Sequence, residues 1–130
     1  MAQASDDVLA PLRHHVSDPS YQFDVGTGWR QLVLECHQAV VAEFPEYEIL
    51  AVKQKWAVLS FQARPRTRRR GGNWTDTEDE RLQTLIDAFA DRSKAICERC
   101  GAHGSLRESR RIDLVLCDQC EPLVPEHGRL

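Results

Sequence analysis

The sequence predicts an α+β fold in which a small αββα core precedes a four-cysteine zinc ribbon. Three observations predict this fold: helical apolar spacing near residues 29–44, β-branched and aromatic residues over 49–61, and two C-x-x-C pairs after residue 96. The 130 residues suit one domain. We therefore expect a loosely ordered N-terminal arm (1–28), an α+β core (29–96), a zinc ribbon packed on the core (97–122) and a C-terminal tail (123–130).

The N-terminal arm lacks a sustained periodic pattern. Ser5 and the two acids after it can cap a short helical turn, which Pro11 interrupts. Tyr21, Phe23 and Val25 alternate with polar residues, which fits a short strand or an extended arm. The first residues carry two acids and no basic flank before an apolar stretch, so we expect no signal peptide and a cytoplasmic protein.

One helix and two strands follow the arm. The helix is predicted to begin at Trp29 and to end before Pro45, and its apolar face consists of Trp29, Leu32, Val33, Cys36, Val40 and Phe44. The strands are indicated by the residues Ile49, Leu50, Val52, Trp56, Val58, Leu59 and Phe61. The connection over residues 54–57 has no Asn-Gly pair, so its turn type stays open.

A basic loop separates the strands from a second helix. Residues 64–73 read RPRTRRRGGN, and their arginines, proline and glycines predict an exposed, irregular segment. Thr75 and Glu78 have the spacing of a capping box, which predicts a helix that begins after Thr75. The apolar face of that helix consists of Leu82, Leu85, Ile86, Phe89 and Ile96.

The strongest motif is C-x2-C-x16-C-x2-C, formed by Cys97, Cys100, Cys117 and Cys120. Four thiolates can complete the tetrahedral shell of one structural Zn²⁺, and no signal peptide points to an oxidising compartment. We therefore expect one structural zinc ion. The alternatives are cysteines that pack or pair by chance and a redox C-x-x-C, although no βαβ context supports the redox role. His103 is a poorer ligand candidate because of its spacing.

No enzymatic motif emerges from the rest of the chain. A four-cysteine site leaves no coordination position for an activated water. Zinc-bound HNH nucleases can carry two C-x-x-C pairs, but residues 101–116 contain one His and no Asp-His. Cys36 and His37 point about 100° apart on a helix, so Cys36 is expected in the core rather than as a nucleophile. We expect a non-catalytic protein.

Composition excludes a membrane protein and gives a mild acidic balance. Hydrophobic residues make up 42% of the chain, and none of the apolar runs approaches the ~18 residues that cross a bilayer. The formal net charge is −3, which argues against general nucleic-acid binding. Positive charge is nevertheless concentrated in residues 64–70.

Five short motifs run through residues 28–120: G-W-x2-L-V, V-K-x-K-W, L-S-F, C-E-R-C-G and L-C-D-Q-C. Together they resemble a loose group of small zinc-ribbon proteins from bacteria and phages. This resemblance implies a single αββα-plus-ribbon unit and implies no activity. The arginine-rich loop is longer and more basic here than in that group.

The cysteine motif alone, over residues 97–120, is similar to the zinc finger of DksA/TraR-type regulators, which bind RNA polymerase. In those regulators the finger follows a long coiled coil. Residues 1–75 show no coiled-coil pattern. The similarity therefore implies the zinc ligands and not the polymerase role.

Two functions fit the sequence. The first, which we favour, is a protein-binding adaptor, inhibitor or immunity-type protein; the second is a nucleic-acid-binding or transcription-associated regulator. The expected contact residues are Arg64, Arg66, Arg68, Arg69, Arg70 and Trp74, since arginine pairs bidentately with carboxylates or phosphates. A solvated loop is the alternative. One continuous face of these arginines with Arg107, Arg110 and Arg111 would favour nucleic acid, and interruption by acids would favour protein.

Overall fold

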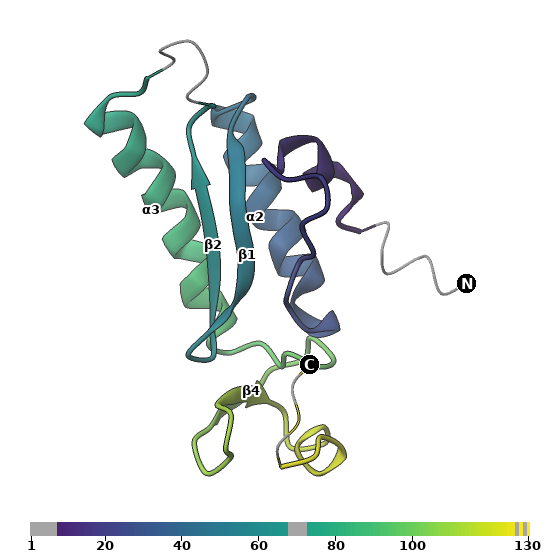
Figure 1. The fold of residues 1–130 in the computed structure, drawn as a ribbon. Coiled ribbons are helices and arrows are strands. Elements are labelled where there is room, and N and C mark those ends of the chain that lie inside the picture. The colour runs from purple at the N-terminus through teal and green to yellow at the C-terminus, as the bar shows by residue number, and fades with distance from the viewer. Residues whose placement is uncertain (1–7, 68–72, 127, 129) are drawn as a thin grey trace.

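The computed structural model describes residues 8–67, 73–126, 128 and 130, and it has the predicted α+β architecture (Figure 1). Two helices lie on one face of a long β-hairpin, and a small hairpin at the cysteine-rich end lies beyond its turn. The elements are η1 (Ala10–His15), η2 (Thr27–Trp29), α2 (Arg30–Glu43), β1 (Glu48–Lys55), β2 (Val58–Arg64), α3 (Asp76–Ser93), β3 (Ser105–Arg107), β4 (Leu114–Leu116) and η4 (Glu121–Leu123). Within the described ranges, no helix has the length and apolar character to span a bilayer.

Helix α2 buries the apolar face that its periodicity predicts. Leu32, Val33, Cys36 and Val40 are all buried, and Cys36 is a core residue as expected. Burial raises the pKa of the Cys36 thiol to about 12, so this group stays neutral and unreactive. Trp29 precedes the helix in η2, is fully buried, and its indole N–H donates to the oxygen of Ile96 at 2.8 Å.

Strands β1 and β2 form an antiparallel hairpin in which Lys55 pairs with Val58 and Val52 with Phe61. The two residues between the strands, Trp56 and Ala57, have φ values of 55° and 61°. Both therefore lie in the left-handed region, as in a type I′ turn. The sequence could not predict this turn because the glycine or asparagine that usually adopts this conformation is absent.

The predicted capping box of helix α3 is confirmed. The Thr75 hydroxyl accepts a hydrogen bond from the Glu78 N–H at 3.1 Å, and the Glu78 carboxylate accepts from the Thr75 N–H at 2.9 Å. Leu82 and Ile86 are buried against the hairpin, and Leu85 and Phe89 pack at the margin of the same core. Helix α3 thus begins where the sequence indicates.

The expectation of a loosely ordered arm is wrong for residues 8–28. Leu9, Leu12 and Val25 are buried in the main core. The segment also lies along the outer edge of β1, where the Asp24 N–H donates to the Val52 oxygen at 3.0 Å and the Asp24 oxygen accepts from Gln54 at 3.1 Å. Local periodicity did not indicate this order because the bonds join residues that are far apart in the sequence.

The cysteine-rich end packs tightly against the core. The Gly28 N–H donates to the Glu98 oxygen at 2.9 Å, and a Cβ atom at Gly28 would clash with the main chain of Cys97 and Gly101. Val124, which we expected in a C-terminal tail, is instead buried with Leu114 in the apolar cluster of the ribbon. The tail prediction is therefore wrong at this position, because an apolar side chain here fills the small core of the ribbon.

Candidate functional site

Two tight turns bring the four cysteines together. In the first, the Gly101 N–H donates to the Cys97 oxygen at 2.9 Å, and Gly101 has a φ of 86°, which favours glycine. In the second, the Glu121 N–H donates to the Cys117 oxygen at 3.0 Å. Strand β4 carries the chain directly to Cys117. The fold thus places both C-x-x-C pairs around one point.

The sulfur positions fit one tetrahedral metal ion. The four Sγ atoms of Cys97, Cys100, Cys117 and Cys120 all lie within 4.8 Å of one another. The Sγ atoms of Cys100 and Cys117 are 3.7 Å apart, far longer than a disulfide bond and close to the ~3.8 Å edge of a tetrahedron with Zn–S bonds of ~2.3 Å. These four side chains can therefore hold a metal ion.

Hydrogen bonds within the turns favour thiolates at part of this site. Burial raises the pKa of the Cys97 thiol, but backbone N–H groups around it outweigh that effect and lower its pKa to about 7. Backbone hydrogen bonding from Cys120 likewise lowers the pKa of Cys117. The Arg99 guanidinium lies 3.5 Å from the Cys120 sulfur, where it offsets the negative charge of a four-thiolate site. The local charges thus suit cation binding.

The arrangement suits a structural ion rather than a catalytic one. Four protein sulfurs fill a tetrahedral shell and leave no position for a water ligand. Among the residues that the structure describes, this is the one cluster of potential ligands, and His103 is not part of it. The prediction of the four cysteines as a ligand set therefore agrees with their geometry.

A buried carboxylate joins this site to the long hairpin. Glu98 is 1% exposed, and its carboxylate accepts hydrogen bonds from the Val115 N–H at 2.8 Å and from the Gln54 amide at 3.4 Å. The same Gln54 amide donates to the Asp113 oxygen at 2.8 Å. Sequence reasoning missed both residues, since neither belongs to a motif and their partners are distant in the chain.

The predicted arginine surface is only partly described by the structure. Arg64 pairs with Glu48, with Nε 2.6 Å from the carboxylate, and Arg66 pairs with Glu78 of the capping box. Trp74 is half-buried. The other three predicted contact residues, Arg68, Arg69 and Arg70, lie outside the described residues. The two described arginines are thus held by acids of their own chain, which is a structural role that the sequence did not indicate.

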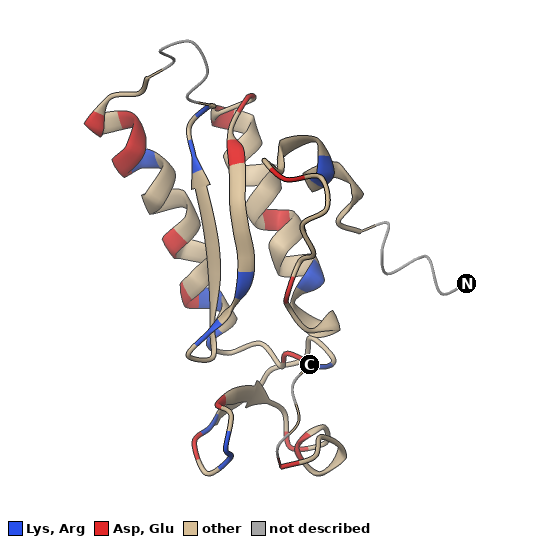
Figure 2. Ribbon diagram, in the orientation of Figure 1, with Lys and Arg blue, Asp and Glu red and all other residues tan. Residues whose placement is uncertain are grey.

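The arginines of the ribbon lie at the other end of the molecule (Figure 2). Arg107 pairs with Asp118 and Glu121, and Arg110 pairs with Glu121. Arg64 lies at the end of β2 that is remote from the hairpin turn, whereas the ribbon contacts Gln54 beside that turn. The described arginines therefore do not join into one basic face.

Trp56, which the sequence pattern places in a strand, has the most exposed large apolar side chain of the described residues. Trp56 is 80% exposed at the tip of the long hairpin. Bulky residues rarely adopt a positive φ, so a tryptophan in such a turn indicates a functional position. The sequence alone does not show that Trp56 lies in a turn. Trp56 is the clearest candidate anchor for a binding partner.

Comparisons with known proteins do not assign a function to this chain. No family model, no curated protein and no solved structure matches the chain. Any function must therefore be inferred from the chemistry and positions of the chain's own side chains.

Proposed function

We propose that this chain is a non-catalytic zinc-ribbon protein that acts by contacting a protein partner, as an adaptor, inhibitor or immunity-type binder. The observation that carries the proposal is the pairing of Arg64 and Arg66 with Glu48 and Glu78, at the end of the molecule opposite the ribbon arginines. Arginines that are neutralised within the chain and divided between two ends offer little to a polyphosphate backbone.

Zinc is the metal that the site favours. Four thiolates in tetrahedral positions match structural Zn²⁺, whereas Ca²⁺ and Mg²⁺ prefer oxygen ligands. Such an ion stabilises a segment whose apolar core is small: five buried residues make up the ribbon's own cluster. In this proposal the ion fixes the shape of the ribbon and takes no part in chemistry.

A protein partner fits the remaining surface better than nucleic acid does. Side chains that anchor protein interfaces are typically exposed Trp, Tyr and Arg, and Trp56 is of this kind. Helix α3 presents several acids to solvent, which would repel a phosphate backbone (Figure 2). Of the predicted contact arginines, Arg68, Arg69 and Arg70 are the ones left to support the second candidate, a nucleic-acid-binding regulator.

Affinity purification of the tagged, zinc-loaded chain from its native host tests this proposal. We expect specific proteins that stay bound after nuclease treatment. Loss of every captured protein after nuclease treatment would instead support the nucleic-acid-binding regulator. A variant with Ala at positions 68, 69 and 70 further distinguishes the two functions. In a nucleic-acid complex, the slope of log K against log salt concentration should fall by up to about three charges, and a protein complex should not show this fall.

A further inference from the structure

The two edges of the long hairpin differ in what covers them. The outer edge of β1 is covered by the N-terminal segment, through the bonds of Asp24 to Val52 and Gln54. The hairpin register turns the main-chain N–H and C=O groups of Leu59, Phe61 and Ala63 towards the outer edge of β2. The Leu59 N–H donates to the Ser93 hydroxyl at 2.9 Å.

The groups of Phe61 and Ala63 have no such cover. Within the described part of the chain, no hydrogen-bond partner is found for their outward N–H and C=O groups. An exposed edge of this kind is a template for another strand. The covered edge of β1 shows that this same sheet accepts an extended segment that is not part of the hairpin.

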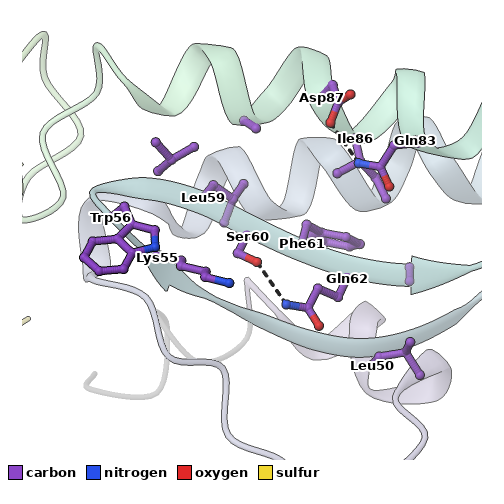
Figure 3. A pocket seen from close by; sticks show the side chains of 13 residues that line it. Leu50, Lys55, Trp56, Leu59, Ser60, Phe61, Gln62, Gln83, Ile86 and Asp87 are labelled. Atoms are coloured by element: carbon purple, nitrogen blue, oxygen red, sulfur yellow. Dashed lines mark hydrogen bonds between the residues drawn. The ribbon is translucent and has the colours of Figure 1, made fainter.

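A groove of about 460 Å³ lies along this edge, between β2 and α3 (Figure 3). Leu59, Phe61 and Ile86 form its apolar floor and are each only 3% exposed, and Ser60 and Gln62 project from β2 beside them. Trp56 and Leu50, which are 80% and 41% exposed, also line it. The groove thus combines unpaired main-chain groups with apolar surface that is accessible at Trp56 and Leu50.

The Trp56 position carries a conformational cost. A left-handed backbone costs an ordinary residue roughly 1–2 kcal/mol, and asparagine or glycine would adopt it more easily. The side chain recovers little of this through packing, because it is 80% exposed. Strain held at an exposed aromatic residue is more typical of a contact site than of a structural turn.

Two charged residues of opposite sign line the groove. On α3, Asp87 accepts from the Gln83 amide at 2.8 Å, and no described lysine or arginine pairs with it. Beside the turn, Lys55 is exposed and pairs with no acid among the described residues. An occupant with a basic residue near Asp87 and an acidic residue near Lys55 would be complementary to both.

From these features we infer that the edge of β2 binds an extended segment of a partner protein as an added strand, with an apolar side chain in the groove between β2 and α3, a basic residue at Asp87 and Trp56 as the terminal anchor. The inference rests on the proposed protein-binding function and names its surface. A second copy of this chain is a poorer occupant, because two-fold pairing of β2 strands would bring the acidic α3 helices of both copies together.

The test uses random nine-residue peptides displayed on phage and selected on the zinc-loaded full chain. We expect enriched peptides to alternate apolar or β-branched residues with polar ones and to carry Lys or Arg at one fixed position. The Phe61 and Ala63 amides should exchange rapidly in the free protein, and a synthetic enriched peptide should slow their hydrogen exchange. N-methylation along one edge of the peptide should abolish binding, and along the other edge it should be tolerated.

Two variants locate the contact. Asp87→Lys should weaken peptide binding at least tenfold, and Ala63→Pro should do the same by removing the outward N–H at an edge position that tolerates proline. Glu46→Lys, the same charge change on an exposed loop, is the matched control and should bind like the parent.

The inference would be overturned by no enrichment of extended peptides, by binding without protection of Phe61 and Ala63, or by equal binding of the Asp87→Lys variant. A dimer of the free chain with a protected Phe61 amide would make a second copy the occupant, and so would also overturn it. If the partners captured from the host bind the Asp87→Lys and Ala63→Pro variants as well as the parent, the protein-binding function stands and the β2 edge is not its surface.

Discussion

The side-chain amide of Gln54, near the end of β1, donates a 2.8 Å hydrogen bond to the main-chain oxygen of Asp113 in the ribbon. This bond connects the two apolar clusters of the protein. Val52, two residues before Gln54, lies in the larger cluster, and Leu114, next to Asp113, lies in the smaller one. The long hairpin and the ribbon are thus joined by specific polar contacts as well as by packing.

Replacing Gln54 by alanine should therefore lower the free energy of unfolding of the zinc-loaded protein by about 1 kcal/mol, since the Asp113 oxygen loses a partly buried donor. Gln62→Ala is the matched control. Its exposed amide bonds only to Ser60 among the described residues, and its effect should stay within about 0.5 kcal/mol. Urea denaturation measures both, and equal effects would show that the Gln54 contact contributes nothing specific.

Zinc content tests the ligand set directly. The purified protein should hold one Zn²⁺ per chain, and Cys117→Ser should lose it, because three thiolates hold the ion less tightly than four. Cys36→Ala removes a cysteine from the core instead and should keep full occupancy. Elemental analysis by mass spectrometry provides the readout, and a fully loaded Cys117→Ser protein would refute the assignment.

The stability of the core should depend on pH through His37. Burial, and then the nearby His15, lower the pKa of His37 to about 4, from an ordinary value of 6.5 that we assign to the unfolded chain. Between pH 6.5 and 4 the unfolded chain binds the His37 proton more readily than the folded protein does. The contribution of His37 to the free energy of unfolding is therefore complete above pH 6.5 and is lost progressively as the pH falls towards 4.

This dependence can be separated from acid release of the metal. The free energy of unfolding of His37→Gln should fall less steeply than that of the parent between pH 6.5 and 5, while the ribbon is the same in both proteins. An NMR titration of the imidazole in the parent should find His37 neutral at pH 6. Identical slopes for the two proteins would contradict the assignment.

The hairpin turn should show a conflict between stability and binding. Trp56→Asn should raise the free energy of unfolding by about 1 kcal/mol, because asparagine tolerates positive φ and little packing is lost from a side chain that is 80% exposed. The same variant should bind the selected peptides more weakly than the parent. Thermal denaturation and peptide titration check the two effects, and a destabilised Trp56→Asn protein would mean that the indole packs in solution.

The features that could be predicted from the sequence are those set by neighbours in the chain. The spacing of Cys97 and Cys100 dictates one metal-binding turn, and Thr75 and Glu78 are three residues apart in a capping box that the structure confirms. The features that could not be predicted depend on distant partners. Leu12 is buried by elements that follow it, and Arg64 is neutralised by Glu48 on the neighbouring strand.

The candidate binding edge belongs to this second kind. Trp56 is read as a strand residue when its sequence neighbours alone are considered, because aromatic residues are common in strands. Only the register of β1 and β2 reveals that it occupies a turn and that Phe61 has its main-chain groups on an open side. Long-range pairing therefore determines the surface, and local pattern does not.

The coverage of β1 by Asp24 limits how these molecules can assemble. A sheet with two open edges can add copies of itself at both and grow into a fibre. A sheet with one open edge can at most join two copies, since each chain brings a single point of attachment and the pair has none left. The N-terminal segment thus leaves each chain a single open edge, so that growth by strand addition would stop at a pair.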